Sequence, residues 1–214
     1  MSYSVKEIYL TIQGEGAQTG LPAVFLRFAG CNLWSGLEND RAKAVCQFCD
    51  TDFVGTNGPG GGRFKTANDL AQSVKGYWPS EMSSNAGQAW VVCTGGEPLL
   101  QLDDILIKAL HRAGFKIAVE TNGTIKAPKG IDWLCVSPKA NADILQTQGD
   151  ELKLVYPQTE NSPEDFEHLN FQYFSLQPLD DENQDAHIQD VIAYCLKHPK
   201  WRLSLQTHKF IGID

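Results

Sequence analysis

Residues 89–123 read AWVVCTGGEPLLQLDDILIKALHRAGFKIAVETNG. The stretch begins with a short apolar run at 89–93, continues with a helical pattern of apolar residues at 103–113, and ends with a second apolar run at 116–121. Gly114 directly follows the helical pattern, at the position where a glycine commonly ends a helix. A strand, a helix and a second strand in this order predict a βαβ unit with parallel strands.

The same alternation extends along most of the chain. Further runs rich in β-branched and aromatic residues lie at 22–30, 132–138, 151–157, 173–178 and 201–207. Further helical patterns lie at 66–77, where Thr66 and Asp69 form a typical helix start, and at 185–198, which Pro199 ends. Because few polar residues interrupt the apolar runs, we expect a parallel sheet covered on both faces. The glycine-rich run at 55–62 is predicted to be a loop.

The overall composition excludes several classes of protein. A chain of 214 residues is long enough for one domain with a real core, so we expect a single domain over 1–214. The net charge of −8 argues against binding to nucleic acid or to an acidic membrane surface. No apolar run approaches the roughly 18 residues of a membrane span, and residues 1–16 lack a secretory signal. We therefore expect a cytoplasmic protein with reduced cysteines.

Three of the six cysteines form a C-x14-C-x2-C pattern, namely Cys31, Cys46 and Cys49. Two cysteines separated by two residues can bind one metal centre, and iron–sulfur clusters are held by such thiolates. With only three protein ligands, one iron of a [4Fe–4S] cluster stays open to another ligand. A structural zinc site is the alternative, but it requires a fourth cysteine or histidine, and His111 is the nearest histidine. The remaining cysteines are expected to be small buried hydrophobes: Cys93, Cys135 and Cys195.

Polar or glycine-rich signatures follow five of the expected strands. They are GCN at 30–32, TGGE at 94–97, ETNG at 120–123, SPK at 137–139 and QP at 177–178. The carboxyl ends of parallel strands meet at one edge of a sheet, where α/β proteins place their chemistry. The sequence therefore predicts one site at that edge.

The cysteine pattern and the GGEP sequence at 95–98 together resemble the radical S-adenosylmethionine superfamily, although the usual first cysteine gap is three residues and here it is fourteen. In that superfamily GGEP holds the methionine amino group, since glycines let carbonyls approach an ammonium and Glu97 adds a charged acceptor. Further motifs cover nearly the whole chain and resemble the 7-carboxy-7-deazaguanine synthase family, in a long-insert variety. These motifs are IYLTIQGEG, RFAGCNLW, CDTD, CTGGEPLLQLD, ETNG, DWLCVSPKA, QPLD and WRLSLQTHK.

The resemblance implies a fold, a reaction and partners. The fold would be a shortened, open (β/α)6-type partial TIM barrel with a cluster-binding insert around 31–62. The reaction would convert 6-carboxy-5,6,7,8-tetrahydropterin to 7-carboxy-7-deazaguanine with loss of ammonia, one step towards queuosine. The implied cofactors are one [4Fe–4S] cluster per subunit, S-adenosylmethionine and Mg²⁺. The implied partners are an external electron donor such as flavodoxin and a second copy in a homodimer.

The resemblance also implies which residues bind each ligand. For S-adenosylmethionine they are Phe48, Cys49, Asp50, Gly96, Glu97, Ser137, Pro138, Lys139, Gln177, Pro178, Leu179 and Asp180. For the pterin they are Ile12, Gln13, Gly14, Glu15, Arg27, Thr94 and Asp214. The implied magnesium ligand is Thr51, and His208 is a weaker catalytic candidate.

Two of these residues also have a physical argument of their own. The Glu15 carboxylate suits two parallel hydrogen bonds from the amino and ring N–H groups of a pterin. Arg27 lies within an apolar strand, where its charge requires a partner. That partner is either the substrate carboxylate or a structural ion pair inside the protein.

Two other functions remain open from the sequence. One is a different radical enzyme, such as a glycyl-radical activase acting on a protein. The other is a binding module without catalysis, stabilised by zinc.

Overall fold

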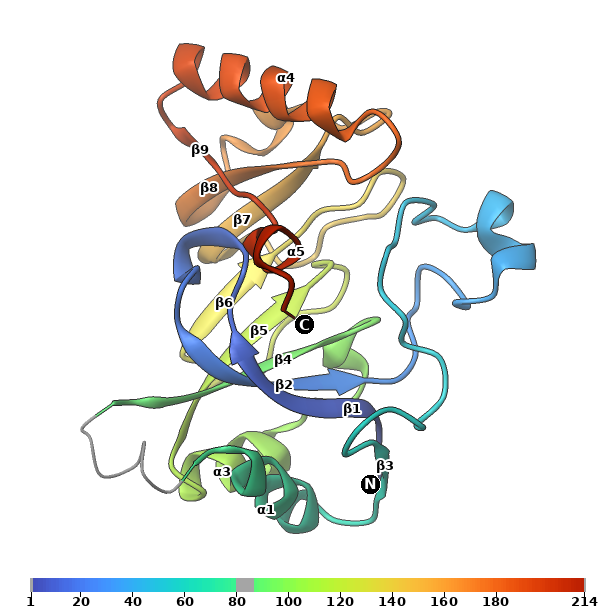
Figure 1. Cartoon of the computed structure of the whole chain (residues 1–214), viewed down its shortest axis with the longest axis vertical. Coiled ribbons are helices and arrows are strands. Elements are labelled where there is room, and N and C mark those ends of the chain that lie inside the picture. Colours follow the sequence, from blue (N-terminus) through green and yellow to red (C-terminus); the bar gives the residue numbers. More distant parts are fainter. Residues whose placement is uncertain (1, 80–86, 214) are drawn as a thin grey trace.

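A single nine-stranded sheet organises the chain, with the strand order β3-β1-β2-β4-β5-β6-β7-β8-β9. The computed structural model describes residues 2–79 and 87–213. The strands are β1 (Tyr3–Ile12), β2 (Pro22–Phe28), β3 (Gly62–Phe64), β4 (Ala89–Gly95), β5 (Phe115–Thr121), β6 (Trp133–Val136), β7 (Gln148–Tyr156), β8 (Asn170–Pro178) and β9 (Trp201–Leu203). The sheet is open and curved rather than closed into a barrel (Figure 1).

The parallel part of the sheet agrees with the pattern of apolar runs. From β2 through β4 to β9, each neighbouring pair of strands is parallel. The middle residues of the central strands are mostly buried, whereas their end residues are in part exposed. The parallel sheet predicted from the sequence is confirmed.

Four α-helices accompany the sheet in the described part of the chain: α1 (Ala67–Tyr77), α3 (Asp104–Arg112), α4 (Gln184–Lys197) and the short α5 (Thr207–Ile211). Helices α1 and α3 pack together on one side, and α4 covers β8 and β9 (Figure 1). The side chain of Thr66 accepts a hydrogen bond from the Asp69 backbone N–H at 3.1 Å, which confirms the predicted helix start.

Three features of the fold differ from the expectation. β1 and β3 add an antiparallel edge that the pattern of apolar runs did not predict. The last expected strand, 201–207, is a strand only to Leu203, and α5 begins at Thr207. The helical repeat is also incomplete, because only a short 3-10 turn, Pro163–Phe166, lies between β7 and β8.

The main core lies between the sheet and the helices. Leu106 and Leu110 of α3 are completely buried beside Val91 of β4 and Ile117 of β5. Cys93 and Cys135 are fully buried in their strands, as expected, whereas Cys195 is half-buried against the core. This core fixes the strands, so that their carboxyl ends face one common edge. No helix in the described part of the chain is long and apolar enough to cross a membrane.

Candidate active site

Two adjoining cavities lie at the edge where the parallel strands end. The larger has a volume of about 540 Å³ and the smaller about 180 Å³. The residues that line both are Glu15, Asp50, Thr51, Thr94, Glu120 and Gln206. Because they share a wall, two ligands bound in them would lie next to each other.

The smaller cavity gathers most of the residues expected to bind S-adenosylmethionine. They are Phe48, Cys49, Asp50, Gly96, Ser137, Lys139, Gln177, Pro178, Leu179 and Asp180. The Lys139 ammonium donates to the Ser137 hydroxyl at 2.5 Å and to the Ser137 carbonyl at 3.0 Å. Residues from several strand ends therefore meet here, as the signatures predicted. Pro138 is not among the residues that line this cavity.

Glu97 is placed differently from the expectation. Its side chain is fully buried and does not line either cavity. The carboxylate accepts hydrogen bonds from the Thr121 hydroxyl at 2.7 Å, from Asn122 N–H at 2.8 Å and from Leu99 N–H at 3.0 Å. In this structure Glu97 joins the ends of β4 and β5 instead of facing a ligand.

Gly96 is required by a close approach of backbone to backbone. A Cβ atom at this position would lie 2.2 Å from the Gly30 carbonyl oxygen and 2.7 Å from Cβ of Cys31. Any side chain here would push away the segment that carries the first cysteine of the pattern. The glycine therefore sets the spacing between the GGEP segment and Cys31.

The three cysteines of the C-x14-C-x2-C pattern lie on two neighbouring hollows. Cys46 and Cys49 line the smaller cavity, and Cys31 lines a separate hollow but is near enough to Cys49 for the two thiols to interact electrostatically. A hydrogen bond from Cys46 lowers the pKa of Cys49 to about 6, so Cys49 is a thiolate at neutral pH. The thiolate is the form of cysteine that binds metals.

The chemistry of these three thiols fits an iron–sulfur cluster with three protein ligands. Their arrangement in this structure does not yet form such a site: among residues 2–79 and 87–213, no group of three or more histidine, cysteine, aspartate or glutamate side chains is placed to hold a metal ion.

A buried charge network around Glu15 lies on the wall that the two cavities share. The Glu15 carboxylate accepts from Lys153 at 2.6 Å, from Gln206 at 3.0 Å and from Gln177 at 3.3 Å. Burial would raise the pKa of Glu15, but the positive charge of Lys153 and these hydrogen bonds outweigh it and lower the pKa. Glu15 is therefore a carboxylate, as binding to donor N–H groups requires.

Lys153 and Glu120 belong to the same network, although neither is among the site residues expected from the sequence. The Lys153 ammonium also donates to Glu120 at 3.0 Å. Burial raises the pKa of Glu120, and the neighbouring Glu15 adds to the increase, while Lys153 opposes it. Glu120 is the first residue of the ETNG signature at the end of a strand, and this position could have identified it as a site residue from the sequence. Lys153 lies within an apolar run of β7, where a charged residue also marks a site.

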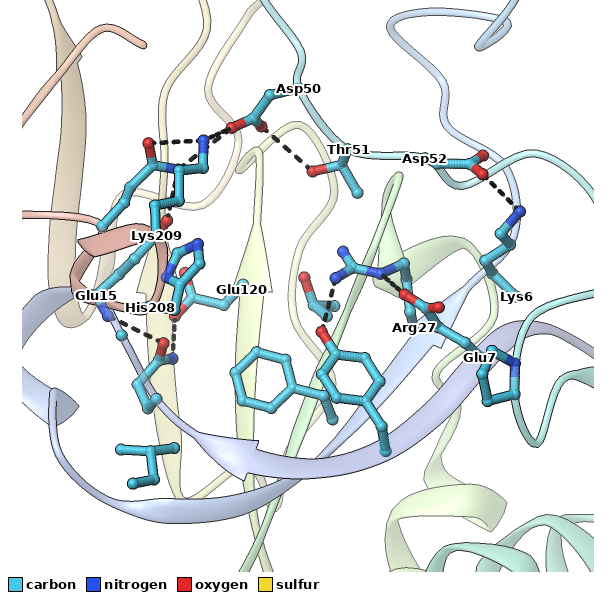
Figure 2. Close-up of a pocket in the computed structure, with 18 residues that line it drawn as sticks. Lys6, Glu7, Glu15, Arg27, Asp50, Thr51, Asp52, Glu120, His208 and Lys209 are labelled. Atoms are coloured by element: carbon cyan, nitrogen blue, oxygen red, sulfur yellow. Dashed lines mark hydrogen bonds and ion pairs between the residues drawn. The ribbon is translucent and has the colours of Figure 1, made fainter. Parts of the chain in front are cut away.

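Arg27 already has protein partners. Its Nε donates to Glu7 at 2.7 Å and its Nη2 donates to the Tyr9 hydroxyl at 2.9 Å. Glu7 and Arg27 are directly opposite each other in the β1–β2 register, which explains the ion pair. Arg27 is therefore in a structural ion pair, and it also lines the larger cavity (Figure 2).

His208 is brought to the larger cavity by α5, close to the QGEG segment. A Cβ atom at position 14 would lie 2.3 Å from Nδ1 of His208, so only glycine leaves room for this imidazole. Ile12, Gln13, Gly14 and Thr94 also line the cavity, as expected. Asp214, the last expected substrate contact, lies outside the described residues.

Thr51 lies on the loop that forms one side of the larger cavity, opposite Arg27 and Glu7 (Figure 2). Its hydroxyl is 3.5 Å from Oδ1 of Asp50. Lys6 anchors the same loop, because its ammonium donates to Asp52 at 2.7 Å, to the Val54 carbonyl at 3.0 Å and to Asn57 at 3.1 Å. This anchor was not foreseen from the sequence.

Comparisons with known proteins agree with this geometry, although no model of a protein family matches the chain. The chain is 62% identical over 213 residues to the 7-carboxy-7-deazaguanine synthase of Caulobacter vibrioides, and 57% identical over 213 residues to that of Bordetella pertussis. Both matches cover the full length of both proteins. The structure is similar to the crystal structure of QueE from Escherichia coli, with a TM-score of 0.70 and 25% identity. That match covers 96% of this chain and 94% of the other.

Proposed function

The chain belongs to the 7-carboxy-7-deazaguanine synthase family, and from this premise we infer that it is a radical S-adenosylmethionine lyase. It converts 6-carboxy-5,6,7,8-tetrahydropterin to 7-carboxy-7-deazaguanine with loss of ammonia, in the biosynthesis of queuosine. The observation that carries this proposal is the pair of adjoining cavities, with Cys46 and Cys49 on the wall of the smaller one and the Glu15 network on the wall that the two share.

In this proposal Cys31, Cys46 and Cys49 hold a [4Fe–4S] cluster. The cluster and S-adenosylmethionine, when bound, supply the radical that starts the rearrangement. The protein holds S-adenosylmethionine in the smaller cavity, where Asp50 and Asp180 offer acceptors for hydroxyl groups and Lys139 and Ser137 offer donors. Because the two cavities share a wall, a cofactor bound in the smaller one would lie next to a substrate bound in the larger one.

The larger cavity then binds and orients the pterin. The ionised Glu15 carboxylate accepts from the amino and ring N–H groups, and Lys153 and Gln206 hold it in place. Glu7 and Tyr9 fix the plane of the Arg27 guanidinium, and its remaining donors bind the substrate carboxylate. A rigid, partly buried pocket of this kind orients the substrate and keeps water away from the radical.

Thr51 completes the proposal as a magnesium ligand. Mg²⁺ prefers oxygen ligands, keeps several waters and accepts few protein ligands. The hydroxyl of Thr51 and the nearby Asp50 carboxylate suit such a shell beside the substrate. A flavodoxin-like electron donor, a homodimer, a single domain and a cytoplasmic location remain predictions.

The deciding experiment is anaerobic reconstitution with iron and sulfide, followed by incubation with S-adenosylmethionine, a reductant and the pterin. Mass spectrometry should detect 7-carboxy-7-deazaguanine and ammonia, and a Cys46→Ala variant is the control without a complete cluster. A chain that develops no brown colour on reconstitution and forms no product would contradict the proposal and favour the zinc-stabilised binding module.

A further inference from the structure

The C-terminal segment after β9 crosses the edge of the sheet and touches both cavities. Thr207 donates to the Gly14 carbonyl through its N–H at 2.9 Å and through its hydroxyl at 2.8 Å. The Gln206 amide donates to Glu15 at 3.0 Å and to Asp50 at 3.2 Å. One short segment therefore connects Glu15 of the larger cavity with Asp50 of the cysteine loop.

Lys209 extends this connection to a third element. Its ammonium donates to Asp50 at 2.8 Å, to the Asp180 carboxylate and to the Gln206 side-chain carbonyl at 3.0 Å. Asp50 directly follows Cys49, and Asp180 lies just after β8. Both residues line the smaller cavity. Figure 2 shows Lys209 beside Asp50 and, on the same helix, His208 turned towards the larger cavity.

Helix α5 has little else to hold it in place. None of the residues from Thr207 to Ile211 is buried, and Phe210 and Ile211 are 61% and 63% exposed. Apolar burial therefore contributes little to its position, and its polar contacts decide where it lies. Segments held in this way open at low free-energy cost.

We propose that Lys209 is a positioning residue that couples the two cavities. When a ligand fills the smaller cavity, it holds the loop of Asp50 and the segment of Asp180 in the arrangement in which both carboxylates bond Lys209. This contact fixes α5, and with it His208 and Gln206, against the larger cavity. The second ligand meets a site that is already ordered, so it binds more tightly. The inference rests on the proposed function, because it assigns the cavities to S-adenosylmethionine and the pterin.

The coupling can be measured as binding, independently of turnover. The probe is S-adenosylmethionine bound to the anaerobically reconstituted protein, with and without the stable product 7-carboxy-7-deazaguanine. In the wild type, the product should tighten S-adenosylmethionine binding by about fivefold or more, as thermodynamic linkage between two sites allows. In Lys209→Met, the product should increase the affinity for S-adenosylmethionine by less than about twofold. Lys209→Arg should retain most of the wild-type increase. Lys200→Met is the matched control, since Lys200 bonds the Glu167 carbonyl and does not line either cavity.

Hydrogen exchange supplies a second readout that a loss of stability alone would not produce. S-adenosylmethionine should slow amide exchange at residues 207–211 in the wild type and in Lys200→Met, but not in Lys209→Met. If the wild type forms no 7-carboxy-7-deazaguanine, the proposed function is wrong and this inference is wrong with it. If the wild type forms the product but shows no coupling, or Lys209→Met keeps the full coupling, only the inference is overturned.

Discussion

Lys153 is only 4% exposed, yet it forms ion pairs with both Glu15 and Glu120. The pKa of Glu15 is lowered in this environment and the pKa of Glu120 is raised, although both carboxylates contact the same ammonium. The difference arises because Gln206 also donates to Glu15, whereas Glu120 faces the negative charges of Glu15 and Glu151. Two carboxylates with opposite shifts can take different roles in one site.

Glu15→Gln and Glu120→Gln should change the acid sensitivity of the fold in opposite directions. Glu15 has a lowered pKa, so its stabilising contribution is present above its unfolded pKa and is lost as the pH falls through the folded value. Glu120 has a raised pKa, so the folded chain binds its proton more tightly and its contribution grows as the pH falls. The free energy of unfolding in urea can be compared between about pH 7 and about pH 4. Its decrease at the lower pH should be smaller in Glu15→Gln than in the wild type, and larger in Glu120→Gln. Equal losses in all three proteins would contradict both assignments.

Arg27→Ala should weaken substrate binding far more than S-adenosylmethionine binding. The variant removes a charge-assisted contact worth about 1.5–3 kcal/mol, which corresponds to about tenfold to a hundredfold in affinity. Separate titrations with each ligand give the comparison, and Arg63→Ala on the exposed edge strand β3 is the control. Equal losses for both ligands would show that the variant disturbs the fold rather than the substrate contact.

Magnesium should stimulate turnover, and Thr51→Ala should reduce that stimulation without removing the cluster. The reason is that Thr51 supplies an oxygen ligand beside the substrate, while the cluster depends on the cysteines. Product formation by EDTA-treated enzyme, with and without added Mg²⁺, measures the effect, and iron analysis checks the cluster. An EDTA-treated wild type that does not respond to Mg²⁺ would exclude this role.

At the scale of elements, the loop after Cys49 depends on strand β1. Lys6 of β1 bonds three groups of this loop, at Asp52, Val54 and Asn57. The loop has little regular secondary structure of its own, so this buried lysine fixes how the thiolate of Cys49 and the hydroxyl of Thr51 are presented. The antiparallel strand β1 thus supports a site that the parallel strands build.

Lys6→Met should therefore weaken the retention of the cluster. The variant leaves Asp52 and the Val54 carbonyl without their donor, and the loop should open more often. Iron release to a chelator should be several-fold faster than in the exposed control Lys65→Met.

A full cluster should not assemble in Cys31→Ala, Cys46→Ala or Cys49→Ala. Cys93, Cys135 and Cys195 variants should assemble it. A full cluster in Cys46→Ala, or equal iron release from Lys6→Met and Lys65→Met, would contradict the respective assignment.

For the whole molecule, the core between α3 and the sheet keeps the strand ends in register. Leu106 is completely buried in this core, whereas its neighbour Ile105 is 64% exposed. These two neighbouring aliphatic residues therefore allow a buried side chain to be compared with an exposed one on the same helix.

Leu106→Ala should cost about 2–5 kcal/mol of the free energy of unfolding, because it removes buried methyl groups and leaves a cavity. Ile105→Ala should change it by less than about 0.5 kcal/mol. Chemical denaturation of the two variants gives both values. Similar values for the two would mean that α3 does not pack on the sheet as described.

The sequence by itself determined the parallel strands, three helices and the edge of the sheet where the site lies. These depend on local periodicity, on helix starts such as Thr66, and on polar residues placed directly after strands, all of which are readable over a few residues. The antiparallel strand β1 was not predicted as a strand, and its final residues belong to the IYLTIQGEG motif. Helix α5 was also missed, because it buries no residue and so has no apolar periodicity.

Only the tertiary structure decided which charged residues are partners. Glu15 and Lys153 are 138 positions apart, and Lys209 and Asp50 are 159 apart. Glu97 was expected to face a ligand, but the close approach of the β4 and β5 ends surrounds its carboxylate with backbone and hydroxyl donors. Such contacts depend on how the strands pack and on which donors burial leaves within reach. The local sequence shows which residues follow each strand, but it does not show which of them pair with one another across the site.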